Sequence, residues 1–220
     1  MISRQCQRLF YRRVLETGTL WGQTDAQNGS NMTAQAAMTA TESDDALMAR
    51  TALRDGDALR LLADRHAQIP WRIAYRMLAD PTEAEDVAQD AMLRLWQYAE
   101  RWQAGGSGVA AWLTRVATNA CLDRIRRRRF VSADAVPERA DEGLRADEAI
   151  EHDEVRAAVA ACIEALPDRQ RAAVILTYYE EQQNKMAADI LAMQVKAFES
   201  LLFRARASLR DCVEGKGVRA

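Results

Sequence analysis

Four consecutive arginines at positions 126–129 end the most basic segment of the chain. Between residues 107 and 130, six arginines accompany a single acidic residue, Asp123. Four neighbouring side chains wrap around a helix end instead of sharing one face, and the helix dipole accounts for only about one or two of them. Neutralisation of phosphate groups explains the whole run better. The six arginines are Arg115, Arg124, Arg126, Arg127, Arg128 and Arg129, and the last four form the predicted phosphate-binding run.

An aromatic ring and an amide lie upstream of this run. Trp112 and Asn119 are seven residues apart, or about two helical turns, so they share a face of the predicted helix. An aromatic ring beside a basic surface suits the stacking of unpaired bases. The competing interpretation places Trp112 in the hydrophobic core.

The chain lacks the residue patterns of the common catalytic and metal sites. It contains no P-loop, no G-x-S-x-G and no H-E-x-x-H. Four widely spaced cysteines form no C-x-x-C pair, and they predict a reducing cytoplasm with neither a disulfide nor a zinc site. We therefore predict no enzyme activity, no cofactor and no metal, with Cys121 and Cys162 as inert buried thiols.

A helix-turn-helix is predicted near the C-terminus. A short helix over residues 184–191 is followed by a turn and by a longer helix over about 195–212. The second helix carries the bases Lys196, Arg204, Arg206 and Arg210, and its first turns carry the acid Glu199. Such a helix suits the major groove of DNA. A plain helical hairpin with a solvated basic face is the alternative.

Composition favours helices as the elements that position these residues. Of the 220 residues, 49% are hydrophobic and 28% charged, with 10 glycines and 4 prolines. Ala, Leu, Arg and Glu outnumber β-branched residues, which predicts an all-α fold. A net charge of −2 excludes a uniformly basic surface but leaves room for local patches. The sequence contains no run of 18 apolar residues, so no membrane-spanning helix is predicted.

The chain divides into four predicted segments. Residues 1–43 are polar and are interpreted as a disordered or misassigned extension, with Met32 and Met38 as alternative starts. Residues 44–130 form a first small helical domain. Residues 131–153 form a flexible acidic linker, since residues 130–156 carry a net charge of −6. Residues 154–214 form a second small helical domain that contains the helix-turn-helix.

One helix of the first domain has a clear start. Asp80 is a predicted N-cap, Pro81 suits the first helical position, and Glu83 completes a capping box. Val87, Ala91 and Leu95 are expected on its buried face. Its other face is a solvated amphipathic surface on periodicity alone. The helix that follows is expected to bury Ala110, Leu113, Ala117 and Cys121.

Taken together, these segments resemble bacterial sigma factors of the extracytoplasmic-function (ECF) group, from about residue 44 to 210. DALRLLADRHAQIPWRIAYRMLADPTEAEDVAQDAMLRLW is similar to the family's first conserved part and its polymerase-binding helix. AAWLTRVATNACLDRIRRRR is similar to its minus-ten helix. ALPDRQRAAVILTYYEE and the helix-turn-helix are similar to its fourth conserved region, which reads the minus-thirty-five element.

The resemblance implies partners and a role for each site residue. Core RNA polymerase would be bound through its β′ clamp helices by Asp86, Gln89, Asp90, Leu93 and Trp96, with further contacts to its β subunit. Promoter DNA would be bound at minus ten by Trp112, Arg115, Asn119 and Asp123, together with Arg124 and the four arginines 126–129. At minus thirty-five the contacts would be Lys196, Ser200, Arg204 and Arg206. The resemblance also implies an anti-sigma factor as partner and a cytoplasmic chain that is monomeric when free.

The chain departs from the family pattern at the helix-turn-helix. The turn reads Leu191-Ala192-Met193-Gln194 where relatives carry Gly after Leu, which removes easy access to positive φ. Glu199 and Leu201 stand where many relatives carry Lys or Arg. Two alternatives stay open on this account: a sigma-like decoy that sequesters an anti-sigma factor, and a helix-turn-helix repressor.

Overall fold

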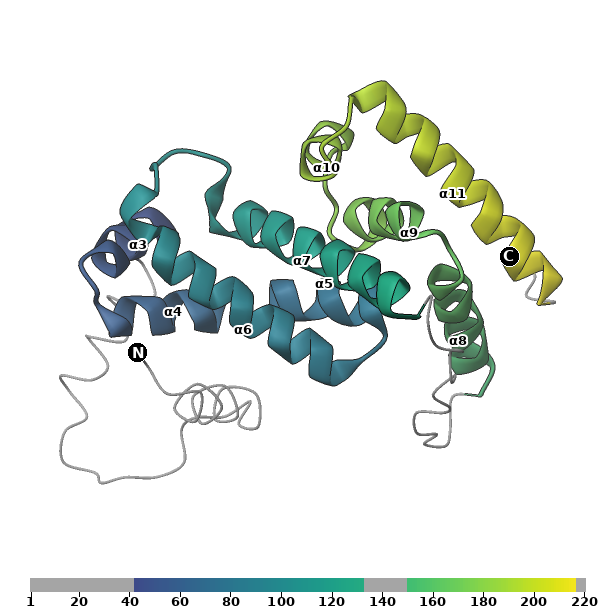
Figure 1. Cartoon of the computed structure of the whole chain (residues 1–220), viewed down its shortest axis with the longest axis horizontal. Coiled ribbons are helices and arrows are strands. Elements are labelled where there is room, and N and C mark those ends of the chain that lie inside the picture. The colour runs from purple at the N-terminus through teal and green to yellow at the C-terminus, as the bar shows by residue number, and fades with distance from the viewer. Residues whose placement is uncertain (1–41, 133–149, 217–220) are drawn as a thin grey trace. The chain divides into compact units, whose positions relative to one another are not determined.

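The computed structural model describes residues 42–132 and 150–216, and every regular element in these two ranges is helical (Figure 1). The all-α prediction is therefore confirmed. The chain forms two compact units, one with residues up to 69 and 88–113, the other with residues 70–87 and 114 onward. Most of the predicted extension 1–43 and of the linker 131–153 lies outside the described residues. None of the described helices is both long and apolar enough to cross a membrane.

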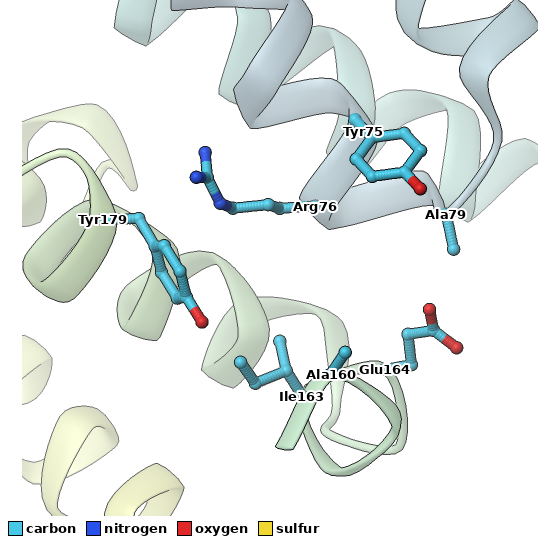
Figure 2. A pocket seen from close by; sticks show the side chains of 7 residues that line it. All are labelled: Tyr75, Arg76, Ala79, Ala160, Ile163, Glu164 and Tyr179. Carbon is cyan, nitrogen blue, oxygen red and sulfur yellow. The ribbon is translucent and has the colours of Figure 1, made fainter. Parts of the chain in front are cut away.

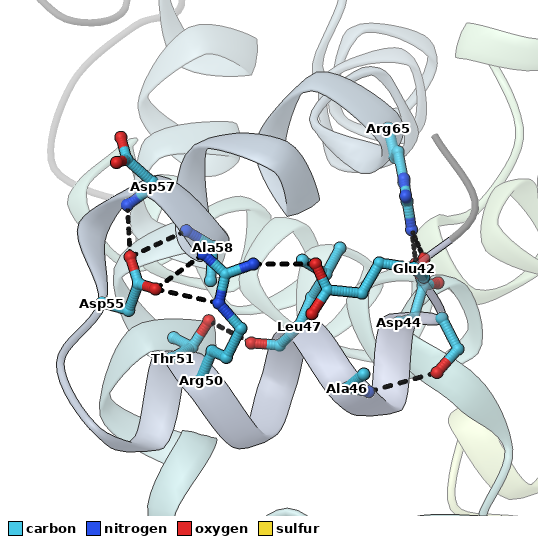
Figure 3. Close-up of polar contacts among 11 residues, drawn as sticks. Glu42, Asp44, Ala46, Leu47, Arg50, Thr51, Asp55, Asp57, Ala58 and Arg65 are labelled. Carbon is cyan, nitrogen blue, oxygen red and sulfur yellow. Dashed lines mark hydrogen bonds and ion pairs between the residues drawn. The ribbon is translucent and has the colours of Figure 1, made fainter. Parts of the chain in front are cut away.

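The first unit begins with two capped helices. In α3 (Asp44–Ala52), the Ser43 hydroxyl accepts a hydrogen bond from the Ala46 amide at 3.2 Å. In α4 (Gly56–His66), the Asp55 carboxylate caps the first turn and also binds Arg50, as Figure 3 shows. Side-chain caps of this kind are typically worth about 1 kcal/mol each. α3 packs against α4 and buries Leu47 and Met48.

Helix α6 (Pro81–Tyr98) starts where the sequence predicts, after α5 (Gln68–Leu78). The Asp80 carboxylate accepts a hydrogen bond from the Glu83 amide at 3.0 Å. Val87 and Leu95 are fully buried. The predicted capping box is only half formed. The Glu83 carboxylate pairs with Arg128 instead of reaching back to the Asp80 amide.

A glycine-containing loop separates α6 and the short helix η1 (Ala99–Arg101) from α7 (Gly108–Ser132). Gly105 and Gly108 have φ values of 78° and 81°, which a side chain would disfavour. Along α7, Leu113, Ala117 and Cys121 are buried as predicted. The prediction for Ala110 is wrong, because Ala110 is exposed and Val109 takes the buried position.

The C-terminal part of the second unit is a set of helices packed on α11 (Val195–Gly215). They are α8 (Ile150–Glu164), α9 (Asp168–Val174) and α10 (Asn184–Ile190), while the π-helical turn η2 (Ile175–Tyr179) contacts α9 and α10. Phe198 and Leu202 of α11 are buried, as are Ile175 and Leu176. α10 and α11 form the predicted helix-turn-helix.

A disulfide bond corrects the prediction of unpaired thiols. Cys162 of α8 is bonded to Cys212 of α11, with the Cα atoms 5.8 Å apart and the two cysteines 50 positions apart in sequence. Sequence spacing carries no signal of this pair, since it arises from the packing of α8 on α11. Cys121 is buried and unpaired as predicted, and burial raises the pKa of its thiol to about 12. Cys6 lies outside the described residues.

The turn between α10 and α11 places alanine in a backbone conformation that favours glycine. Ala192 has a φ of 49°. The Met193 amide donates to the Ala188 carbonyl at 3.0 Å, and the Ala192 amide to the Asp189 carbonyl at 3.3 Å. This hydrogen-bond pattern is a Schellman motif, in which this position is usually Gly. The chain thus forms a glycine-type turn with alanine, at the cost of left-handed backbone strain.

Replacing Ala192 by Gly should therefore stabilise the protein. Relief of the Cβ strain is expected to raise the free energy of unfolding by about 1 kcal/mol, measured by urea denaturation followed by circular dichroism. Ala197→Gly, at an exposed position inside α11, is the matched control and should lower it by about 1 kcal/mol. A lower unfolding midpoint for Ala192→Gly would contradict the strain argument.

Candidate nucleic-acid interface

The predicted polymerase-binding residues form a stripe along α6. Asp86 and Asp90 are exposed, whereas Gln89, Leu93 and Trp96 are half-buried. Their spacing of three and four residues keeps them on one side of the helix. The stripe is acidic at its N-terminal end and more apolar towards Trp96.

Trp96 is covered by a neighbouring cation. The Arg54 guanidinium lies 5.4 Å from the centroid of the Trp96 ring and also pairs with Glu100. Arg54 itself has a φ of 66°, just after α3. The face of Trp96 that Arg54 occupies is therefore not available to a partner.

The arginines near the end of α7 differ in what holds them. Arg128 pairs with Glu83, and Arg124 donates to the Glu83 backbone carbonyl at 3.4 Å. Arg126 meets Asp123 at 3.4 Å, and Arg129 meets Asp168 at 2.8 Å. Among the described residues, Arg127 is exposed and makes no hydrogen bond or ion pair. The predicted run thus divides into one unengaged guanidinium and several that also anchor the helix end.

Upstream on α7, the predicted strand-binding residues lie at or near the surface. Arg115, Asn119 and Asp123 are exposed, while Trp112 is half-buried. Trp112 belongs to an aromatic cluster, because the Tyr98 ring stacks on it with centroids 5.3 Å apart and an interplanar angle of 26°. Trp102 meets the Tyr98 ring edge-on at 6.4 Å.

Asp45 of α3 fixes one end of this aromatic cluster. Its carboxylate accepts a hydrogen bond from the Trp102 indole at 2.7 Å and another from the Gly105 amide at 3.0 Å. These two donors lower the pKa of Asp45 below its usual value, the Trp102 bond contributing most. The carboxylate is therefore charged at neutral pH, where both hydrogen bonds hold the loop before α7. Sequence reasoning missed Asp45, Tyr98 and Trp102, and only the closeness of Tyr98 and Trp102 in sequence offered a signal.

The recognition helix α11 exposes all four residues predicted to contact DNA: Lys196, Ser200, Arg204 and Arg206. The Ser200 hydroxyl donates to the Lys196 carbonyl at 3.0 Å, and Arg204 donates to the Ser200 carbonyl at 3.3 Å. Glu199 is exposed among them. Leu201, however, is only 8% exposed and lies in the core, so Glu199 alone departs from a basic contact surface.

The predicted residues therefore lie on exposed or half-buried helix surfaces and do not line a described pocket. An open pocket of about 260 Å³ lies in the second unit, lined by Tyr75, Arg76, Ala79, Ala160, Ile163, Glu164 and Tyr179 (Figure 2). None of the predicted site residues lines it. Within residues 42–132 and 150–216, no group of three or more His, Cys, Asp or Glu side chains is placed to hold a metal ion. Helix surfaces with exposed cations suit a polymer such as DNA.

Family comparisons agree with this arrangement. Residues 62–131 match the family model for Sigma-70 region 2, and residues 156–209 match the one for Sigma-70, region 4. The chain is 31% identical over 165 residues to the ECF RNA polymerase sigma factor SigL of Mycobacterium tuberculosis. The matched region covers 73% of this chain and 91% of SigL. It is 32% identical over 154 residues to SigE of Mycolicibacterium smegmatis, covering 68% of this chain but only 59% of SigE.

Two solved structures resemble the fold. CnrH, in complex with the cytosolic domain of CnrY, has a TM-score of 0.58 and 25% identity, over 79% of this chain and 99% of CnrH. The sigma factor RpoE of Bartonella quintana, in complex with the anti-sigma factor NepR, has a TM-score of 0.54 and 20% identity, over 67% and 91% of the two chains. The second likeness concerns the fold alone.

Proposed function

Because the chain belongs to the ECF RNA polymerase sigma factors, we propose that it binds core RNA polymerase and directs transcription initiation at a limited set of promoters. The observation that carries this proposal is the exposure of basic side chains on two different helices, Arg127 on α7 and Lys196 and Arg206 on α11. A helix-turn-helix repressor needs only the second of these helices. Two DNA surfaces in one chain suit a protein that contacts a promoter at two elements.

The mechanism is binding and not turnover. The α6 stripe that begins at Asp86 contacts the β′ clamp helices of the polymerase, and the second unit also contacts the β subunit. α7 holds the minus-ten strand, where cations neutralise phosphates and aromatic rings accept unpaired bases. α11 enters the major groove at the minus-thirty-five element.

Regulation is proposed through a protein partner. CnrH, the structural relative at 25% identity, was solved in complex with the cytosolic domain of CnrY. By analogy, this chain is held inactive by an anti-sigma factor. It acts in the cytoplasm, where its polymerase is found, and is monomeric when free of both partners.

One observation favours a second candidate function, a decoy that sequesters an anti-sigma factor. Glu199 is exposed in the first turns of α11, where a carboxylate repels phosphates. The turn that precedes it is formed despite Ala192, so the missing glycine gives the decoy no support. A glutamate such as Glu199 can also accept a hydrogen bond from a cytosine amine in the major groove. Glu199 is therefore compatible with a working sigma factor that recognises an unusual promoter sequence.

Run-off transcription with purified bacterial core polymerase on a genomic promoter library tests the proposal. Discrete new start sites that share paired upstream elements are the expected result. Polymerase binding without any start would favour the decoy. The absence of any polymerase binding would overturn the proposed function and favour the alternative of a helix-turn-helix repressor.

Arg127→Ala should weaken promoter binding without changing stability. Arg127 is exposed and unengaged in the described structure, so its removal costs only a phosphate contact. The slope of log binding constant against log salt concentration should become shallower by roughly 0.7 to 0.9. Titration of a fluorescent promoter fragment with holoenzyme at several salt concentrations measures it.

Arg128→Ala is the matched control. Arg128 pairs with Glu83, whose second carboxylate oxygen is buried without a hydrogen-bond partner. Its loss should lower the unfolding midpoint as well as promoter binding, whereas Arg127→Ala should leave the midpoint unchanged. An unaltered salt slope for Arg127→Ala would remove Arg127 from the phosphate-binding residues.

A further inference from the structure

Tyr98 at the end of α6 is an exposed aromatic ring that none of the predicted roles uses. It is 37% exposed, although one face of its ring stacks on Trp112. Trp102 packs against it edge-on, and Trp102 is held in turn by Asp45. Two neighbouring rings thus orient the Tyr98 ring, and Asp45 in turn fixes one of them.

Two cations flank this ring along the chain. Arg94 precedes Tyr98 by four residues on α6, which places the two side chains on one face of that helix, and Arg101 follows Tyr98 by three residues in η1. Both arginines are exposed, and neither pairs with an acid among the described residues. The nearby Glu100 is engaged by Arg54. The segment therefore presents a cation, an aromatic ring and a second cation, and neither cation is paired with a carboxylate among the described residues.

This combination matches single-stranded nucleic acid. Backbone phosphates of an unpaired strand bind cations, while each base offers a flat face that stacks on an aromatic ring. A buried packing role leaves the exposure of Tyr98 unexplained. Tyr and Arg are also enriched at protein interfaces, so a loss of core polymerase binding on substitution of Tyr98 is the result that would favour a protein partner.

We propose that Tyr98 is the outer base-stacking residue of the minus-ten surface and that Arg94 and Arg101 hold the phosphates on either side of the stacked base. This inference rests on the proposed function and deepens it. Trp112 stacks on one face of the Tyr98 ring and so supports that ring. Asp45 is a positioning residue, which acts by holding Trp102 and the loop at Gly105.

The test measures binding of reconstituted holoenzyme to two fluorescent DNAs from a promoter found by run-off transcription. One is the single-stranded non-template minus-ten segment, and the other is a duplex that carries only the minus-thirty-five element. Tyr98→Leu keeps apolar area against Trp112 but lacks an aromatic face, and Tyr98→Phe keeps the face. Tyr98→Leu should weaken single-strand binding roughly 10-fold and leave duplex binding unchanged, while Tyr98→Phe should resemble the native chain.

Tyr75→Ala is the matched control. Tyr75 is 46% exposed and stacks on Trp71 at 5.2 Å, but it lies on α5, outside the proposed strand-binding surface. Its loss should leave binding of both DNAs unchanged. Normal single-strand binding by Tyr98→Leu would overturn the inference, and so would weakening of both DNAs or of core polymerase binding. If the native chain binds neither DNA with core polymerase, the proposed function itself fails.

Discussion

Replacing Asp86 by arginine is expected to abolish binding to core RNA polymerase while the protein stays folded. Asp86 is exposed near the start of α6 and makes no hydrogen bond or ion pair among the described residues. An exposed substitution of this kind changes stability by about 0.5 kcal/mol or less. A reversed charge inside an interface costs several kcal/mol, so affinity should fall roughly 100-fold or more.

Glu85→Arg is the control for this prediction. Glu85 is the neighbouring exposed acid on α6, but its side chain points about 100° away around the helix. The two variants have the same net charge and nearly the same position relative to the helix dipole. Holoenzyme formation by size-exclusion chromatography, with circular dichroism for the fold, measures the effect. Equal polymerase binding by the two variants would reject the proposed α6 interface.

Local signals explain why α6 was predictable. Its N-cap, Pro81 and the period of Val87, Ala91 and Leu95 all lie within about five turns of chain. The same holds for the helix-turn-helix, since the buried positions of α11 recur every three or four residues. Helix boundaries and buried faces follow from interactions between residues close in sequence.

Long-range contacts explain what sequence reasoning missed. Asp45 and Trp102 are 57 residues apart, and no residue pattern connects them. The pairing of Arg128 with Glu83 also depends on where two helices meet, so the arginine run looked uniform in sequence. Leu201 appeared to be a surface departure and is a core residue, because its side chain faces the second unit's interior. Residue types were visible in sequence, but their partners were not.

The disulfide leads to the second large expected effect. Replacing both Cys162 and Cys212 by serine should lower the free energy of unfolding by about 3 kcal/mol under non-reducing conditions, because the unfolded chain loses a cross-link over 50 residues. The measurement is urea denaturation followed by circular dichroism. Dithiothreitol should reduce the stability of the native chain by a similar amount and leave the double variant unchanged.

Thiol titration of the denatured, non-reduced protein distinguishes this bond from a mere packing contact. The native chain has four cysteines, so pairing of Cys162 with Cys212 leaves two reactive thiols, Cys6 and Cys121. Four reactive thiols after purification in air, together with a double serine variant as stable as the native chain, would contradict the bond. If only two thiols react, α11 is covalently tied to α8 at the end opposite the turns that we propose bind DNA. The recognition helix would then owe part of its stability to the redox state of its surroundings.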